Sequence, residues 1–443
     1  MRIIKDFAEA REVLSRNAHP QTVNVSPRLA TSLKVMFGTE DPQAAVIMII
    51  NEVRRSGDAA LKEYSRQISG VTLESIEVSR DEIAAACNKI PRELLSAIET
   101  AASQVKLFHQ KQFDAFMSGV KKMSPGTVAR VLDQAGLYVP GGTANYPSSV
   151  LMTAIPARAA GVKKIVICTP PGEDGHIPDI TLAAAFVAGV DRVFAVGGAQ
   201  AIAAMAYGTQ SVPAVDKICG PGNIFVMLAK KLVYGTVDID GLQGPSEVVV
   251  IADANANPVW CAADILAQAE HDGMAQSIFI TTSEAISVAV LKEIEICLNT
   301  LSRKKIIEES LAAFGITCIV ENMGQAVDLA NLYAPEHLCL YVKDYDKILS
   351  QIKNAGCVFV GTHPTVVIGD YVAGPSHALP TGGTARFASP LNTTDFVRLM
   401  NVVDVGTKML AKYGWVAATL ANAEGLTAHA RAVGIAADNR RSR

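Results

Sequence analysis

The sequence lacks the features that mark secreted, membrane-spanning or disulfide-rich proteins. The N-terminal residues Met1–Asp6 have no apolar run of the signal-peptide kind, and no apolar stretch reaches the ~18 residues that a membrane span needs. The eight cysteines are scattered and none stands in a C-x-x-C pair, so the sequence suggests neither a thiolate zinc site nor a disulfide framework. We therefore expect small buried thiols, no membrane partner and a reducing, cytoplasmic location.

A marked excess of charge is also missing. The formal net charge is −3 and no dense stripe of lysine and arginine appears, which argues against nucleic acid as a partner. The sequence contains neither a P-loop nor a G-x-G-x-x-G fingerprint. What it does contain is 443 residues with 49% hydrophobic and 19% charged side chains, enough for a large core and about three domains of ~150 residues.

Two stretches of the chain alternate strand-like apolar runs with alanine-rich helical patterns. One extends from about residue 138 to 245 and the other from about 246 to 390, and this alternation predicts an α/β fold with parallel sheets. We expect the helices before residue 120 to pack against the second stretch, and the chain after Asp395 to be helical only. The expected domains are an N-terminal arm, 1–33; a main αβ domain, 34–137 plus 246–390; a second αβ domain, 138–245; and a helical piece, 391–443.

The segment Asn331–Leu338 is the most informative local pattern. Helical spacing of apolar residues precedes it, strand-like alternation follows it, and Pro335 disfavours helix at the residue before it. Glu336 and His337 are therefore expected where a helix gives way to a strand, in a rigid frame and facing a ligand. A carboxylate beside an imidazole supplies two groups for proton transfer. The alternative is a surface glutamate and a half-buried histidine in an ordinary turn.

Three glycine turns lie at predicted element boundaries: Gly197–Ala201, Gly220–Asn223 and Gly244–Glu247. Their backbone N–H groups are suited to a phosphate or another polar ligand at the edge of an open sheet. A nucleotide-like ligand is the favoured interpretation, and glycines that only solve a packing problem are the alternative.

A metal site is a further possibility in the second half of the chain. Gln268 and His271 stand at i and i+3 on a predicted helix, which places both on one face. Asp370, His377 and His429 add donors far away in sequence, and five of the eight histidines follow residue 270. Taken singly, each of these residues also fits a purely structural role, such as a histidine at the end of a helix.

Taken together, these strings resemble the histidinol dehydrogenase family, with the same order and nearly full-length coverage. The strings that carry the resemblance are Gly136–Gly142, Gly197–Ala203, Val215–Asn223, Gly244–Val248, Ala267–Asp272, Ala334–Leu338, Gly369–Tyr371, Gly374–Gly383 and Glu424–His429. The resemblance implies two αβ domains of incomplete Rossmann type, the second expected domain binding NAD. It also implies a helical C-terminal piece and an N-terminal arm that intertwine two chains as a homodimer.

The resemblance also assigns residues to roles. The acid–base pair would be Glu336 and His337. The zinc ligands, one ion per subunit, would be Gln268, His271, Asp370 and His429. The NAD contacts would be Tyr138, Gln200 and Asn223. The substrate contacts would be Ser246, His377 and Glu424, together with His337 and the four zinc ligands.

The implied reaction is the last step of histidine biosynthesis, the oxidation of L-histidinol to L-histidine through L-histidinaldehyde, with two NAD reduced. His337 would take the alcohol proton and Glu336 would activate the water that adds to the aldehyde. In the family, zinc orients the imidazole and amine of the substrate, and an amide ligand suits that template role.

Two departures from the family pattern are visible. His363-Pro364-Thr365 stands where many members have Ser/Thr-Pro-Glu, and Gly273 stands where proline is common. They leave room for a relative that oxidises another small polar alcohol, such as a sulfonated propanediol. A zinc hydrolase without NAD is disfavoured by the glycine turns and by the absence of H-E-x-x-H. A zinc-stabilised assembly protein would have no evident need for the Glu–His pair.

Overall fold

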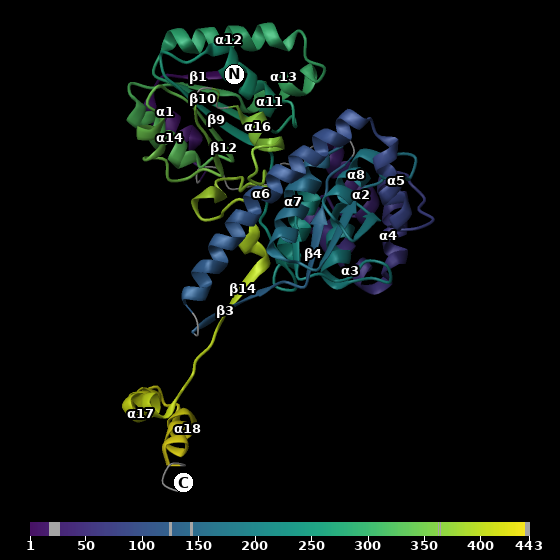
Figure 1. The fold of residues 1–443 in the computed structure, drawn as a ribbon. Helices are drawn as coiled ribbons and strands as arrows, with labels where there is room; N and C mark the ends of the chain where they lie inside the picture. The colour runs from purple at the N-terminus through teal and green to yellow at the C-terminus, as the bar shows by residue number, and fades with distance from the viewer. Residues whose placement is uncertain (17–26, 124–125, 142–144, 362, 364, 439–443) are drawn as a thin grey trace. The chain divides into compact units, whose positions relative to one another are not determined.

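The structure is a computed structural model that describes residues 1–16, 27–123, 126–141, 145–361, 363 and 365–438 (Figure 1). The segment 17–26 of the expected arm lies outside the described residues, as do residues 142–144, which begin at the last residue of the string Gly136–Gly142. The chain divides into two compact units. The larger contains Met1–Asp114 and Val131–Val397, and the smaller contains Ala115–Arg130 and Arg398–Arg443.

The first sheet of the larger unit has six strands in the order β1-β11-β10-β9-β12-β13, all in parallel pairs. Its strands are β1 (Arg2–Ile4), β9 (Glu247–Ala252), β10 (Gln276–Thr281), β11 (Ile316–Ile319), β12 (His337–Tyr341) and β13 (Cys357–Phe359). Successive side chains of β9 point to opposite faces, as a pleated strand requires. Both faces of β9 are buried, and after Glu247 this strand is an uninterrupted apolar run, as is typical of parallel sheets.

Helices cover both faces of this first sheet. One face packs on α1 (Phe7–Leu14) and α14 (Met323–Tyr333), and the other packs on α11 (Pro258–Ala269), α12 (Glu284–Leu298) and α13 (Lys304–Phe314). Figure 1 shows these helices around β9, β10 and β12. The short helices α15 (Tyr345–Leu349) and α16 (Val366–Tyr371) follow β12 and β13 along the chain.

The second sheet of the larger unit has the strand order β2-β6-β5-β4-β7-β8. It is parallel except where β2 pairs with β6. Its strands are β2 (Glu77–Val78), β4 (Gln134–Tyr138), β5 (Lys164–Thr169), β6 (Arg192–Ala195), β7 (Lys217–Cys219) and β8 (Asp238–Ile239). The expected parallel α/β architecture is thus confirmed, with two separate six-stranded sheets.

Helices again cover both faces of the second sheet. One face packs on α3 (Pro42–Ser56), α4 (Asp58–Ser69), α9 (Gly198–Tyr207) and α10 (Ile224–Val233). The other packs on α5 (Arg80–Lys89), α6 (Arg92–Lys122), α7 (Pro147–Ala160) and α8 (Asp179–Val187). Helix α2 (Pro27–Phe37) precedes α3, and two 3-10 turns, η1 (Thr384–Arg386) and η2 (Thr393–Phe396), lie late in the larger unit.

Two expectations about packing are wrong. The helices α3, α4 and α5 pack on the second sheet, not on the segment after residue 246. An amphipathic pattern shows that a helix has a buried face, but it does not identify the sheet that buries it. The first residues also do more than form an arm, because β1 pairs with β11 at the edge of the first sheet.

The smaller unit contains a two-stranded sheet, β3 (Thr127–Val131) with β14 (Val397–Asn401), and a pair of packed helices, α17 (Thr407–Ala423) and α18 (Thr427–Asp438). The expectation of helix only after Asp395 is therefore wrong, since a strand forms where Val397, Leu399 and Asn401 alternate with Arg398 and Met400. Gly425 has a positive φ of 77° and separates α17 from α18, whereas Gly414 lies within α17 although glycine commonly interrupts helices.

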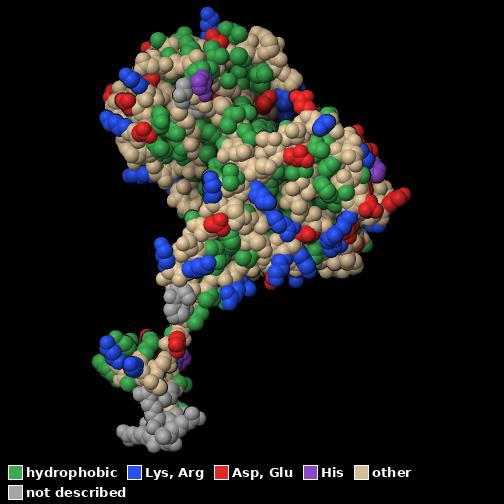
Figure 2. Space-filling model, viewed as in Figure 1, with side chains coloured by type: hydrophobic (Ala, Val, Ile, Leu, Met, Phe, Trp, Pro, Cys, Tyr) green, Lys and Arg blue, Asp and Glu red, His purple; other side chains and the backbone are tan. Residues whose placement is uncertain are grey.

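The helices of the smaller unit have apolar side chains on their surface, visible as hydrophobic atoms in Figure 2. Large exposed examples are Met409, Tyr413, Trp415, Leu420, Leu426 and Ile435. Trp415 alone is 69% exposed. Several large apolar side chains exposed on one pair of helices are typical of an interface with another protein surface. None of the described helices is long and apolar enough to pass through a membrane.

Candidate active site

The predicted helix-to-strand corner is present and sharply formed. Helix α14 ends at Tyr333, and β12 begins at His337. Between them Ala334 has a φ of 52°, the only positive φ of a non-glycine residue among those described. Such a conformation costs roughly 1–3 kcal/mol and persists where the surrounding structure enforces it. The corner is therefore a rigid frame for the two residues that follow Pro335.

Glu336 and His337 are held by the main chain of a neighbouring strand. The N–H of Glu247 donates to Oε2 of Glu336 at 2.8 Å, and Nδ1 of His337 lies 3.2 Å from the carbonyl oxygen of Glu247. On the far side of the ring, Nε2 of His337 lies 3.2 Å from Oδ1 of Asp370. The two side chains are more buried than expected, at 7% and 4% exposure.

The charges around His337 favour its protonated form. Burial alone would lower the pKa of His337, but the carboxylates of Glu336 and Asp370 outweigh burial and raise it well above the usual value. Asp370 shows the reciprocal effect. Burial would raise the pKa of its carboxyl, but the hydrogen bond from His337 and the fields of three histidines lower it. The surroundings thus stabilise an imidazolium, the species that a general base becomes after taking a proton.

The residues proposed as metal ligands come together only in part. His271 and Asp370 are near enough for the histidine to influence the carboxylate. Gln268 lies inside α11 at 1% exposure, and its Nε2 has no hydrogen-bond partner. His271 lies two residues beyond the end of α11, so the expectation of two ligands on one helical face is wrong in detail. Its N–H donates to the carbonyl of Gln268, which closes a turn at the end of the helix.

A buried aspartate on α11 fixes the element that carries Asp370. Oδ1 of Asp264 accepts bonds from the hydroxyl of Thr365 at 3.0 Å and from the N–H of Val366 at 3.3 Å, where α16 begins. Its Oδ2 accepts from the hydroxyl of Tyr341 at 2.7 Å. One carboxylate thereby ties α11, β12 and α16 together. Within the described residues, no group of three or more His, Cys, Asp or Glu side chains converges on a common point.

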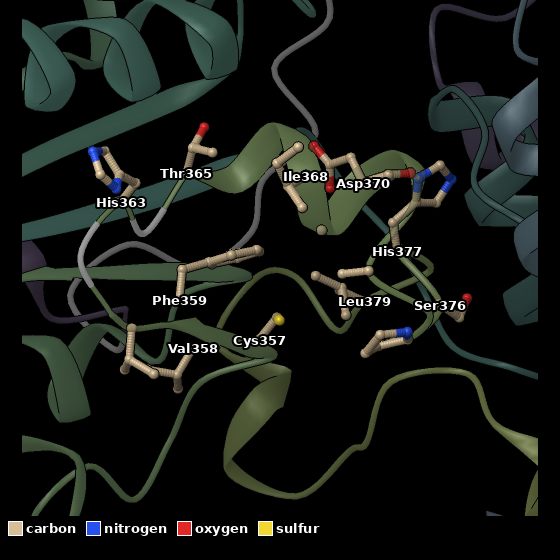
Figure 3. Close-up of a pocket in the computed structure, with 14 residues that line it drawn as sticks. Cys357, Val358, Phe359, His363, Thr365, Ile368, Asp370, Ser376, His377 and Leu379 are labelled. Carbon is tan, nitrogen blue, oxygen red and sulfur yellow. Dashed lines mark hydrogen bonds between the residues drawn. The ribbon is translucent and has the colours of Figure 1, made fainter. Parts of the chain in front are cut away.

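A pocket of about 310 Å³ lies beside Asp370. In Figure 3, Asp370 and His377 lie toward one end of it, and His363 and Thr365 toward the other. Nδ1 of His377 lies 2.9 Å from the main-chain oxygen of Asp370. Burial lowers the pKa of His377 despite the nearby carboxylate, so the neutral form of this imidazole is favoured beside His337.

The departure at residue 363 occupies the edge of this pocket. The exposed ring of His363 packs on Trp260, with 4.3 Å between ring centroids. Its neighbours 362 and 364 lie outside the described residues. A methyl group added at Gly273 would come 3.4 Å from a carboxylate oxygen of Glu309, a neighbour that can give way. Neither departure displaces Asp370 or His337.

Two of the three predicted NAD contacts lie at the start of α9. The hydroxyl of Tyr138 accepts a bond from the N–H of Gly198 at 3.0 Å, and the buried Gln200 has an Oε1 without a partner. The third, Asn223, is exposed and caps α10 by accepting from the N–H groups of Phe225 and Val226. Its side-chain oxygen therefore has a structural use that the sequence pattern did not reveal.

The remaining predicted substrate contacts are divided between the two units. Ser246 is half-buried directly before β9 in the larger unit. Glu424 and His429 lie in the smaller unit, where both side chains are exposed, Glu424 at the end of α17 and His429 within α18.

Sequence reasoning missed two polar residues beside the site. Ser149 on α7 has its hydroxyl 3.5 Å from Nε2 of His377. Glu247 lies within the string Gly244–Val248 but was assigned no role in the sequence analysis. In the structure it contacts both Glu336 and His337, the predicted acid–base pair. Nothing local distinguishes Ser149. Glu247 could have been recognised, because it is a lone carboxylate directly before the apolar run Val248–Ala252. A charge that is buried in such a strand requires a partner.

A buried carboxylate–imidazole pair at the end of a parallel-sheet strand, with a pocket beside it, defines an α/β enzyme equipped for proton transfer. Comparison with known proteins is more specific. The family model for histidinol dehydrogenase matches residues 36–436. The chain is 54% identical to the histidinol dehydrogenase of Dehalococcoides mccartyi strain CBDB1, covering 98% of this chain and 99% of that protein. It is 46% identical to that of Clostridium acetobutylicum, covering 91% and 94%.

Solved structures agree with these sequence comparisons. The crystal structure of histidinol dehydrogenase from Elizabethkingia anophelis superposes with a TM-score of 0.86 at 35% identity, covering 98% of this chain and 96% of that one. The chain belongs to the histidinol dehydrogenase family. It is accordingly an NAD-dependent oxidoreductase. The family resemblance that the sequence strings indicated is confirmed.

Proposed function

We propose that this chain oxidises L-histidinol to L-histidine through L-histidinaldehyde, with reduction of two NAD, as the last step of histidine biosynthesis in the cytoplasm. The observation that carries the proposal is the buried contact of His337 with Asp370, beside Glu336 and the pocket. In the first step a hydride leaves the alcohol carbon for NAD while the O–H proton passes to His337. The electrons of the C–H bond thus end on NAD, and the substrate becomes the aldehyde.

The second step requires water. Glu336 accepts a proton from a water molecule, and the resulting oxygen nucleophile adds to the aldehyde carbon. The proton that His337 took in the first step passes to the aldehyde oxygen, which gives the hydrate and restores neutral His337. A second hydride then leaves that carbon for a second NAD while His337 takes a proton from one hydroxyl group, and the carboxylic acid so formed releases its remaining proton to give the carboxylate. The contact of Glu336 with the N–H of Glu247 involves only Oε2. Its carboxylate therefore has acceptor capacity left for water.

The family's zinc fits the residues present. Gln268 has a buried amide nitrogen without a partner, and turning the amide over would put its oxygen, a metal donor, in that place. We propose Gln268, His271 and Asp370 as ligands from one chain and His429 as the fourth. When bound there, zinc would serve as a template for the imidazole and amine of histidinol. Ser246, His377 and Glu424 would meet the other polar groups of the substrate.

NAD is proposed to bind at the turns that open α9 and α10. The support is the pair of polar groups at the first turn of α9, the Tyr138 hydroxyl bonded to Gly198 and the unpartnered oxygen of Gln200. The exposed Asn223 lies at the first turn of α10. Helix N-termini of this kind present N–H groups and a partial positive charge to phosphates.

We further propose a homodimer in which two chains share each active site. The smaller unit contains about 60 residues, a size at which an independent core is marginal, and it has large apolar side chains on its surface. Exchange of this unit between two chains would bury that surface. It would also bring Glu424 and His429 of one chain to Gln268, His271 and Asp370 of the other.

The test of the function is a substrate comparison with the metal-loaded, full-length enzyme. L-histidinol and a sulfonated propanediol are each supplied with NAD, and NADH formation is followed. We expect turnover with histidinol and at least a 100-fold lower kcat/KM with the sulfonate, since unpaired polar groups are rejected by about that factor or more. Preference for the sulfonate would show that the departures at residues 363 and 273 have changed the substrate.

A further inference from the structure

A buried ion pair links the N-terminal segment to the catalytic corner. Nη1 and Nη2 of Arg16 donate to the two carboxylate oxygens of Glu247 at 2.8 and 2.7 Å. The side chain of Glu247 is 2% exposed and that of Arg16 is 20% exposed. Neither residue belongs to the acid–base pair or to the proposed ligands. A paired geometry with two parallel bonds is the strongest that arginine makes with a carboxylate.

The third donor of the same guanidinium reaches the corner itself. Nε of Arg16 donates to the main-chain oxygen of Tyr333 at 2.7 Å, and the guanidinium lies 3.9 Å from the centre of the Tyr333 ring. Tyr333 is the last residue of α14, where carbonyl groups lack partners within the helix. Arg16 therefore fixes the residue directly before the strained Ala334, from which the chain continues to Glu336.

Glu247 extends this link to both members of the acid–base pair. Its side chain binds Arg16, while its N–H holds Glu336 and its carbonyl oxygen lies against the ring of His337. A displacement of this one residue would thus move two hydrogen bonds at the reacting groups. Misplacement of about 1 Å in catalytic groups can lower rates by roughly 100-fold.

Loss of Arg16 would leave Glu247 in an unfavourable position. Besides Arg16, the carboxylate of Glu247 accepts only one bond among the described residues, from the N–H of Gly382 at 3.1 Å. Burial already raises the pKa of this carboxyl, against the effect of the arginine. A buried charge deprived of its partner is strongly destabilising, so the side chain would protonate or move toward water.

We propose that Arg16 is a positioning residue for catalysis, acting on Glu336 and His337 through Glu247 and the Tyr333 carbonyl. This inference rests on the proposed roles of Glu336 and His337. It makes the segment before residue 17 a part of the active-site framework rather than only an arm.

The test compares full-length Arg16→Met and Arg16→Lys with wild type. We expect Arg16→Met to lower kcat by roughly 10- to 100-fold, with KM for NAD and for histidinol within about threefold of wild type, because binding groups are untouched. Arg16→Lys keeps a positive charge but loses the paired geometry, so its kcat should lie between those of wild type and Arg16→Met. The matched control is Arg2→Met, which removes an exposed ion pair with Glu9 from the same segment and should leave kcat unchanged.

A second variant covers the case in which Arg16→Met does not fold. Glu247→Gln keeps the main chain and the size of the side chain while removing its charge, and it should lower kcat without changing either KM. If both single variants fold, the double variant should be no slower than the slower single one, because the two residues act as a unit. A folded Arg16→Met or Glu247→Gln with wild-type kcat overturns the inference, as do losses that multiply in the double variant. Wild-type enzyme inactive on histidinol would instead contradict the proposed function.

Discussion

At the scale of single residues, the proposed acid–base pair of Glu336 and His337 can be dissected because the two side chains have different partners. His337→Asn removes the imidazole but leaves every proposed zinc ligand in place. We expect both oxidation steps to be nearly abolished, with a loss of roughly 10²–10⁴ in rate and unchanged zinc content. Single-turnover NADH formation from histidinol and from histidinaldehyde, together with metal analysis, measures this. If His337→Asn also lost zinc, its lower activity could not be attributed to the missing base.

Glu336→Gln separates the two steps. Glutamine keeps an oxygen that can accept the N–H of Glu247, so the corner remains intact while the proton acceptor is lost. The oxidation of histidinaldehyde should therefore slow much more than the oxidation of histidinol. Comparison of the two steps in single-turnover experiments checks this, and equal losses would contradict the division of labour between Glu336 and His337.

The proposed NAD contacts Gln200 and Asn223 can be tested by substitution, with Asn223→Ser as the control for the loss of a helix cap. Gln200→Ala should raise the KM for NAD much more than that for histidinol. Asn223→Ala should do the same but should also lower the melting temperature, because it removes the cap of α10, an interaction of about 1 kcal/mol. Asn223→Ser keeps a cap and removes the amide, so it should raise the KM for NAD without the loss of stability. A changed KM for histidinol with an unchanged KM for NAD would contradict the assignment of Gln200 and Asn223 to the cofactor.

At the scale of elements, the start of α4 provides a test of the fold that does not involve the site. Asp58 accepts hydroxyl bonds from Thr209 and Ser211, each at 2.6 Å, and so fixes the loop after α9. Burial would raise the pKa of Asp58, but these bonds lower it below the usual value. A lowered folded-state pKa means that the stabilisation is present above the unfolded pKa of about 3.9 and is lost as the pH falls through the folded one.

Asp58→Asn should therefore lower the free energy of unfolding at pH 7 by about 1 kcal/mol. The difference from wild type should shrink as the pH falls below about 4. Urea titrations of both proteins over this pH range measure it, with kcat as a control that should not change. A difference of the same size at neutral and acid pH would show that the charge of Asp58 contributes nothing.

The elements also show what sequence patterns can and cannot predict. The apolar patterns of β9, β10 and α14 are visible in the sequence, because their periodicity is set by local burial. Ser79 caps α5 by accepting a bond from the N–H of Glu82, a helix start that depends only on neighbouring residues. The packing of α3 to α5 was not predictable, since an apolar stripe fits any sheet.

The same limit applies to the site. The position of Glu336 and His337 at a corner followed from Pro335 and the change of period around it. Arg16 could not be connected with Glu247, because the two lie 231 positions apart and only the fold brings them together. The capping bond of Asn223 was likewise hidden within a motif that suggested a ligand.

At the scale of the whole molecule, the proposed sharing of active sites between two chains can be tested with a pair of inactive variants. If sites are shared, His337→Ala and His429→Ala chains, unfolded and refolded together, form mixed dimers in which one site has both lesions and the other has none. Random pairing should then restore about a quarter of wild-type activity. Each variant refolded alone should remain inactive, and wild type carried through the same treatment controls for recovery. An inactive mixture beside an active control would show that each site is built within one chain.

The central claim is that one site with a Glu–His pair carries out both oxidations of histidinol. The most direct measurement is the stoichiometry of the complete reaction, with NADH and products quantified after limiting L-histidinol has been consumed. We expect two NADH and one L-histidine for each histidinol consumed, without accumulation of free aldehyde. One NADH per histidinol with the aldehyde as product, or no NADH at all, would contradict it.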